Sequence, residues 1–129
     1  MKIGLDVHGV IDEMPGFINL INSLLIKDNI NNDTNHEIHI ITGLTHKDFL
    51  KTPAVDGIEY THFYSITDDL MNKESYTLDI YGRPRFDCYA WNIAKAEYCR
   101  KNEIDIMFDD SEIYGKYFQT PYFQVRRTK

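Results

Sequence analysis

MKIGLDVHGVID, residues 1–12, is the segment of this chain that is most informative about its fold. A short apolar strand runs directly into Asp6, and Gly9 follows three residues later. In open sheets of parallel strands, ligands bind just beyond the carboxyl ends of the strands. The stretch therefore predicts a buried strand that presents the Asp6 carboxylate at a ligand-binding edge, with Gly9 allowing a sharp turn or a close approach of the backbone to a ligand.

Two further apolar runs end in polar residues. The run EIHII, residues 37–41, leads to Thr42-Gly43, and the run IDIMF, residues 104–108, leads to Asp109-Asp110. Short apolar strands that alternate with helical patterns predict a parallel sheet covered by helices on both faces. We expect an α/β fold of the three-layer, doubly wound, Rossmann-like kind with about five strands. Its strand ends meet at one edge, which brings these polar residues together.

The remaining elements follow from periodicity, caps and turn residues. We expect further strands over residues 60–66 and 122–125. We expect helices over 15–26, roughly 46–51, from 67 onward, over 87–101 and after Ser111. Residues 28–35, rich in Asn and Asp, predict a loop, and residues 77–85 predict a loop or a small hairpin.

Length and composition indicate one ordinary soluble domain, spanning residues 1–129. The net charge of −6 argues against a partner such as extended nucleic acid, which needs a basic surface. No apolar run approaches the roughly 20 residues that span a membrane. Cys88 and Cys99 would lie about 16 Å apart on one helix, too far for a disulfide, which favours reduced thiols and a cytoplasmic protein.

Two other groups of residues carry little signal. The histidines outside the first stretch, namely His36, His39, His46 and His62, show no metal-ligand spacing in the sequence. The basic tail, residues 126–129, is typical of a solvated terminus.

The residue types at the predicted edge suit phosphate chemistry. Asp6 is a candidate nucleophile or metal ligand, and alternatively a turn cap. One of Asp109 and Asp110 can reach a cation such as Mg²⁺ while the other supports its surroundings, although the pair also suits a solvated turn. Thr42-Gly43 offers a hydroxyl and backbone N–H groups to an anion, or is a simple strand-to-helix turn.

Taken in order, the segments LDVHGVID, IITG and MFDDS resemble the haloacid dehalogenase (HAD)-like superfamily of phosphotransferases, and look closest to small phosphatases of the 5′-nucleotidase type. The resemblance implies that Asp6 accepts the phosphoryl group and that Thr42 and Gly43 bind it. It also implies that Mg²⁺ is held by Asp6, the carbonyl of His8 and the pair Asp109-Asp110. No segment is long enough for a large cap, so an open site is expected.

The resemblance also implies a basic residue that neutralises the phosphoryl group. Lys95 is our first choice, although it would lie two turns into its helix. Arg85, in the loop before that helix, is the rival, and Lys73 is a more distant one.

His8 departs from the pattern of the family, which has a second Asp at this position as general acid and base. Histidine can do acid–base work near neutral pH but cannot reproduce the charge of a carboxylate. His8 is therefore a working acid–base group, a substitution that impairs turnover, or a histidine packed in its turn. Asp12 lies close enough to supply a carboxylate, but is better explained as the cap of the following helix.

The sequence thus predicts a Mg²⁺-dependent phosphohydrolase that acts on a small-molecule phosphate ester, such as a nucleotide, through an aspartyl-phosphate. The alternative is an impaired binding module of the same fold. A response-regulator receiver fits poorly, because receivers carry their acidic pair after the first strand. Oligomeric state is left open.

Overall fold

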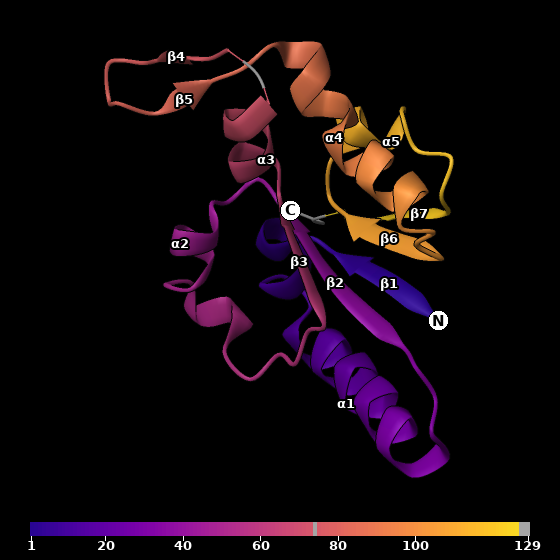
Figure 1. Ribbon diagram of the computed structural model, residues 1–129. Coiled ribbons are helices and arrows are strands. Elements are labelled where there is room, and N and C mark those ends of the chain that lie inside the picture. Colours follow the sequence, from indigo (N-terminus) through magenta and orange to yellow (C-terminus); the bar gives the residue numbers. More distant parts are fainter. Residues whose placement is uncertain (74, 127–129) are drawn as a thin grey trace.

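The computed structural model describes residues 1–73 and 75–126. Its main sheet has the strand order β3-β2-β1-β6-β7, and all four pairings are parallel (Figure 1). The strands are β1 (Lys2–Leu5), β2 (Glu37–Thr42), β3 (His62–Ser65), β6 (Ile106–Asp109) and β7 (Tyr122–Gln124). The predicted five-stranded, Rossmann-like parallel sheet is confirmed.

Helices connect these strands. They are α1 (Pro15–Asn32), α2 (His46–Phe49), α3 (Ile66–Lys73), α4 (Cys88–Lys101) and α5 (Glu112–Gly115), with a kinked turn over Val7–Ile11 and a short helical turn over Pro53–Val55. The expected small hairpin is present as antiparallel β4 (Thr77–Leu78) and β5 (Pro84–Arg85), and it extends away from the main sheet (Figure 1). Every parallel connection therefore has a helix in it, as the alternation predicted.

Apolar side chains cover both faces of the sheet. On one face, Ile18 of α1 packs with Leu5, Ile40 and other strand residues in a single buried cluster. On the other face, Cys99 of α4 packs with Ile41 and Met107. Because successive strand residues point to opposite faces, Ile40 is buried in the first cluster and Ile41 in the second. This three-layer packing holds the strand ends at fixed positions.

Several predicted boundaries were wrong. The strand predicted over residues 60–66 runs only from His62 to Ser65, and Ile66 begins α3. The predicted loop over residues 28–35 is helical as far as Asn32, because Asn32 Nδ2 donates to Asp28 Oδ1 at 2.7 Å one turn earlier. The helix ends only at Asp33, whose φ of 53° is left-handed. The strand predicted from residue 104 begins at Ile106, since Ile104 N donates to Cys99 O and closes the end of α4 instead.

Within residues 1–73 and 75–126, no helix has the length and apolar character needed to cross a membrane. Of the basic tail predicted to be solvated, residues 127–129 lie outside the described residues. Cys88 is exposed and Cys99 is buried, and both are free thiols.

Candidate active site

The carboxyl edge of the sheet gathers the residues that the sequence singled out. Asp6 directly follows β1, and Thr42 and Asp109 are the last residues of β2 and β6, the two strands that flank β1. Asp6 N donates to Phe108 O at 3.0 Å, which ties the end of β1 to β6. Because β2 and β6 flank β1, these three residues lie close together in space although they are far apart in sequence.

An ion-paired lysine lies at the centre of this edge. Lys95 Nζ lies 2.7 Å from Asp109 Oδ2 and 3.1 Å from Asp6 Oδ1. All three side chains are buried, and Asp109 is fully so. The ammonium group also lies 5.2 Å from the centre of the Tyr114 ring, in reach of a cation–π contact.

The structure shows which of the basic candidates lies at the carboxyl edge of the sheet. Lys95 reaches the edge because its long stem runs through the buried interior from the middle of α4. Arg85 Nη2 instead pairs with Asp79 in the hairpin at 3.2 Å, and Lys73 Nζ pairs with Asp69 at 2.9 Å. Among the three, only Lys95 lies between the strand-end carboxylates.

The charges of this group depend on each other. Burial raises the pKa of Asp6, the Lys95 ammonium opposes the rise, and the Asp109 carboxylate adds to it, so that the pKa reaches about 6. Burial disfavours the charged form of Lys95, but the Asp6 and Asp109 carboxylates outweigh it and hold its pKa above the usual value. Burial and the adjacent Asp109 also raise the pKa of Asp110. Asp6 is thus largely ionised at neutral pH and faces a fully charged lysine.

The carboxylates are positioned by backbone donors. Val7 N donates to Asp6 Oδ1 at 2.8 Å, so the turn-cap role of Asp6 coexists with its ion pair. Ser111 N donates to Asp109 Oδ1 at 2.9 Å. These bonds fix the rotamers of both acids before any ligand arrives, which is what a preorganised site requires.

Gly9 allows the acidic pair to approach the first turn. Its φ is +87°, and a Cβ atom added there would lie 2.2 Å from Asp110 Oδ2. Only glycine tolerates both the positive φ and the close approach of the Asp110 side chain. The prediction that Gly9 makes a sharp turn is therefore confirmed, and the close neighbour is Asp110.

An open cavity of about 540 Å³ lies over this edge. Most of the predicted site residues line this cavity. The residues of its lining are Asp6, His8, Thr42, Gly43, Leu44, Lys95, Asp110, Ser111 and Tyr114. Asp109 lies beneath it, fully buried. Volumes of 300–1,000 Å³ are typical of small-molecule sites.

Thr42 and Gly43 form one wall of the cavity. Thr42 Oγ1 accepts a hydrogen bond from Leu44 N at 3.1 Å, so the predicted strand-to-helix turn is present. Gly43 lies against Trp91, and a Cβ atom added there would approach that ring to 3.1 Å. This wall, which packing against Trp91 holds in place, thus offers a hydroxyl and backbone N–H groups to an anion.

His8 lies at the rim, with 61% of its side chain accessible. Its Nδ1 lies 3.0 Å from Asp12 Oδ2, and Asp12 Oδ1 accepts a hydrogen bond from Gly9 N at 2.7 Å. The expectation that Asp12 caps the next helix was wrong, because the residue at that position is Met14. Asp12 instead orients the His8 ring.

Besides the apolar Leu44, two polar residues of the cavity lining were missed as candidates. Ser111 was expected only as a helix cap, a role it fills by accepting from Tyr114 N at 3.1 Å. Tyr114 was one of many aromatic residues in its region, and Trp91 Nε1 donates to its hydroxyl at 2.7 Å. Periodicity contains no signal for these positions, because the docking of α5 against α4 decides them.

The donor set fits a hard dication. Asp6, Asp109 and Asp110 each offer a carboxylate oxygen, and the three atoms lie within 4.8 Å of one another. Mg²⁺ is bound in proteins by one or two carboxylates together with waters and substrate phosphates.

Comparisons of the chain with protein-family models, with curated proteins and with solved structures found no match.

Proposed function

We propose that this protein is a Mg²⁺-dependent phosphohydrolase of small phosphomonoesters, of the type found in the HAD-like superfamily. The observation that carries the proposal is the Lys95 ammonium held between the Asp6 and Asp109 carboxylates under an open cavity. A buried cation beside an ionised carboxylate is what an aspartate nucleophile needs in order to approach an anionic phosphoryl group.

In the proposed reaction, Asp6 attacks phosphorus, an oxygen–phosphorus bond forms, and the ester oxygen leaves with its electron pair. The leaving oxygen takes a proton from the His8 imidazolium. A water molecule then gives a proton to His8 and attacks phosphorus, which releases inorganic phosphate and regenerates the Asp6 carboxylate. The sum is ester plus water giving alcohol plus phosphate.

Each remaining residue has a role in this scheme. Lys95 neutralises charge on the phosphoryl oxygens, and Thr42 and Gly43 bind those oxygens from the opposite wall. Asp6, Asp109, Asp110 and the His8 carbonyl would hold Mg²⁺, which would supply further neutralisation of charge when bound.

The contact with Asp12 supports an acid–base role for His8. A carboxylate at Nδ1 favours a proton on that nitrogen, so Nε2 exchanges the second proton with substrate or water. This arrangement replaces the carboxylate of the family with an oriented imidazole.

A second candidate, a binding module without turnover, is favoured by the 61% exposure of His8 at the rim. General acid–base catalysis is typically worth 10²–10⁴-fold, and a poorly positioned imidazole would forfeit that factor. The site would then bind a phosphate ester and Mg²⁺ without appreciable hydrolysis.

The test is phosphate release from p-nitrophenyl phosphate and a panel of nucleoside monophosphates, with and without Mg²⁺. We expect Mg²⁺-dependent release that Asp6→Asn abolishes and that Asp56→Asn, at an exposed aspartate, leaves unchanged. Absence of release across the panel would overturn the enzyme proposal.

The variant His8→Asp separates the two candidates. A loss of activity supports a working histidine, and a gain of at least about tenfold supports the impaired module. If no variant releases phosphate, Mg²⁺-dependent binding of a nucleoside monophosphate by calorimetry identifies the binding module.

A further inference from the structure

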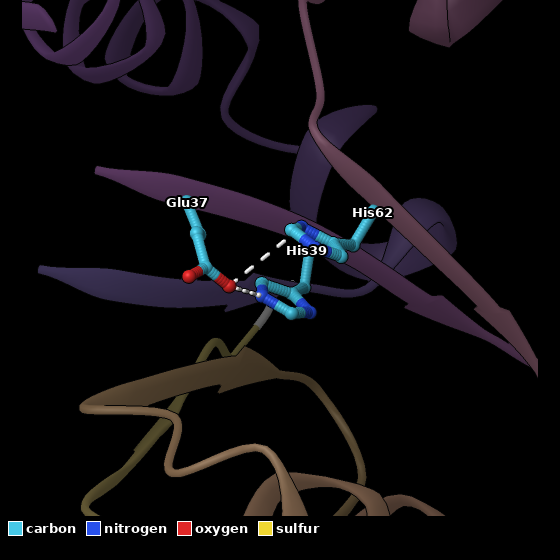
Figure 2. Close-up of side chains that lie close together, drawn as sticks. All are labelled: Glu37, His39 and His62. Carbon is cyan, nitrogen blue, oxygen red and sulfur yellow. Dashed lines mark hydrogen bonds and ion pairs between the residues drawn. The ribbon is translucent and has the colours of Figure 1, made fainter. Parts of the chain in front are cut away.

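Two imidazoles and a carboxylate form a cluster on neighbouring strands (Figure 2). None of these three residues lines the cavity over the carboxyl edge. His39 Nε2 lies 2.8 Å from Glu37 Oε1, and His62 Nδ1 lies 3.7 Å from the same oxygen. One ligand atom from each of the three residues falls within 4.8 Å of the others. None of the three has a part in the proposed phosphohydrolase.

Strand geometry creates this cluster. Glu37 and His39 are two residues apart on β2, so their side chains share one face. His62 on β3 is the register partner of His39 and projects beside it. The cluster is at the opposite end of β2 from Thr42, about 10–16 Å along the strand at 3.3 Å per residue.

His39 is held as metal-ligating histidines are usually held. Its side chain is only 1% exposed, and its second nitrogen, Nδ1, lies 2.7 Å from the Tyr98 hydroxyl. Because a carboxylate only accepts, Nε2–H of His39 donates to Glu37 in this structure and Nδ1 accepts from the Tyr98 hydroxyl. In a metal-bound state, His39 would carry its proton on Nδ1, donate it to the Tyr98 oxygen and present the Nε2 lone pair to the ion. A hydrogen-bond partner on the far nitrogen is typical of imidazoles that bind metals.

We propose that Glu37, His39 and His62 form a metal site for a divalent transition ion of the Zn²⁺ class. The two imidazole nitrogens favour Zn²⁺ or Co²⁺ over Mg²⁺, and a carboxylate oxygen is also a common Zn²⁺ ligand. Three protein ligands leave one tetrahedral position for water. The ion would join the amino ends of β2 and β3 and stabilise this end of the sheet.

Binding requires one movement. The His39 and His62 rings are stacked, with centroids 4.2 Å apart and an interplanar angle of 5°. Because a nitrogen lone pair lies in the plane of its ring, one ion cannot lie in both planes until a ring turns. His62 is able to turn, since 47% of its side chain is exposed. It would exchange its 2.7 Å contact with Thr61 Oγ1 for the ion.

The test measures Zn²⁺ binding to the full chain by calorimetry in excess Mg²⁺, which competes for the acidic site. Co²⁺ titration followed by visible absorption reports the ligand geometry. We expect one Zn²⁺ bound per chain and an intense tetrahedral Co²⁺ spectrum. We also expect Zn²⁺ to raise the melting temperature, because it binds only the folded chain.

The variants His62→Ala and Glu37→Gln should each weaken Zn²⁺ binding at least about tenfold. Tyr98→Phe, which keeps the ring stacked on Tyr64, should weaken it by about tenfold through loss of the partner of His39. His46→Ala, at an exposed histidine outside the cluster, is the matched control and should bind as the wild type does.

Absence of Zn²⁺ binding, or equal binding by the wild type, His62→Ala and Glu37→Gln, would overturn the proposal. Zn²⁺ binding that only Asp6→Asn removes would place the ion at the acidic site and also overturn it. The phosphohydrolase proposal is tested separately, because His62→Ala and Glu37→Gln should release phosphate as the wild type does.

Discussion

Replacement of Lys95 by methionine is the most direct test of the candidate active site. The substitution keeps most of the volume of the side chain and removes its charge. In the wild type, the ammonium lies 2.7 Å from Asp109 Oδ2 and 3.1 Å from Asp6 Oδ1, and only 2% of the side chain is exposed. The variant would leave two buried carboxylates facing each other without a cation.

The expected cost follows from this geometry. Removal of one partner from a buried ion pair typically costs 3–5 kcal/mol, because the remaining charge stays buried without compensation. Since solvent hardly reaches Lys95, we expect a loss of about 3–5 kcal/mol in the free energy of unfolding at neutral pH. At about 1.4 kcal/mol per factor of ten, the folding equilibrium would fall roughly 150- to 5,000-fold.

The loss should depend on pH. Without Lys95, the pKa of Asp6 rises further above the value of about 6 that it has in the wild type. A carboxyl group whose folded pKa is above its unfolded value contributes stability at low pH and loses it as the pH rises. The deficit of Lys95→Met should therefore grow as the pH rises from about 4 through 6 and beyond.

The measurement is urea unfolding followed by circular dichroism. With a denaturant slope of about 2 kcal/mol per molar, the midpoint should fall by about 1.5–2.5 M. Lys101→Met, at an exposed lysine of the same helix, should shift it little. Adding Asp6→Asn to Lys95→Met should restore part of the loss. If the free energy of unfolding of Lys95→Met lies within about 1 kcal/mol of the wild-type value, the ion pair does not have the buried character inferred above.

Three further predictions concern other parts of the chain. Gly9→Ala should destabilise the protein more than Gly57→Ala in thermal unfolding, because both have positive φ but only the first places a Cβ atom 2.2 Å from the acidic pair; equal losses would contradict this. Backbone N–H donors in the hairpin lower the pKa of Asp79 below 3.8. The stabilisation that the Asp79 carboxylate gives to the hairpin is therefore fully present above pH 3.8, and it is lost as the pH falls through the lowered pKa of the folded state. An NMR pH titration of the hairpin amides checks this, and amide shifts that finish changing above pH 3.8 would disprove it. In thiol labelling of the native protein, Cys88 should react quickly and Cys99 should not, because burial raises the pKa of Cys99 to about 12; two fast thiols before unfolding would count against the structure.

The order of elements was predictable because local patterns encode it. Apolar runs of strand length alternate with helical periodicity, and the parallel sheet with helices on both faces follows from that alternation. The boundary at Asn32 was not predictable from composition, because Asn and Asp favour loops in general and here bond to each other along the helix.

The site was predictable in part for the same reason. Asp6, Thr42 and Asp109 each end an apolar run, and parallel strand ends share an edge. Ser111 and Tyr114 were missed as lining residues because the cavity they line forms only when α5 packs beside α4. The roles assigned to these residues stay predictions until phosphate release is measured.

The polar residues that end the strands could be identified from the sequence, since strand length and hydrophobic pattern are local properties of the chain. Packing between distant segments places Lys95, rather than Arg85 or Lys73, between Asp6 and Asp109. It also brings Glu37, His39 and His62 together. The physical reason is the same in both cases: helix docking and strand register depend on burial of apolar surface between distant segments, and no local pattern specifies which side chains that packing brings together.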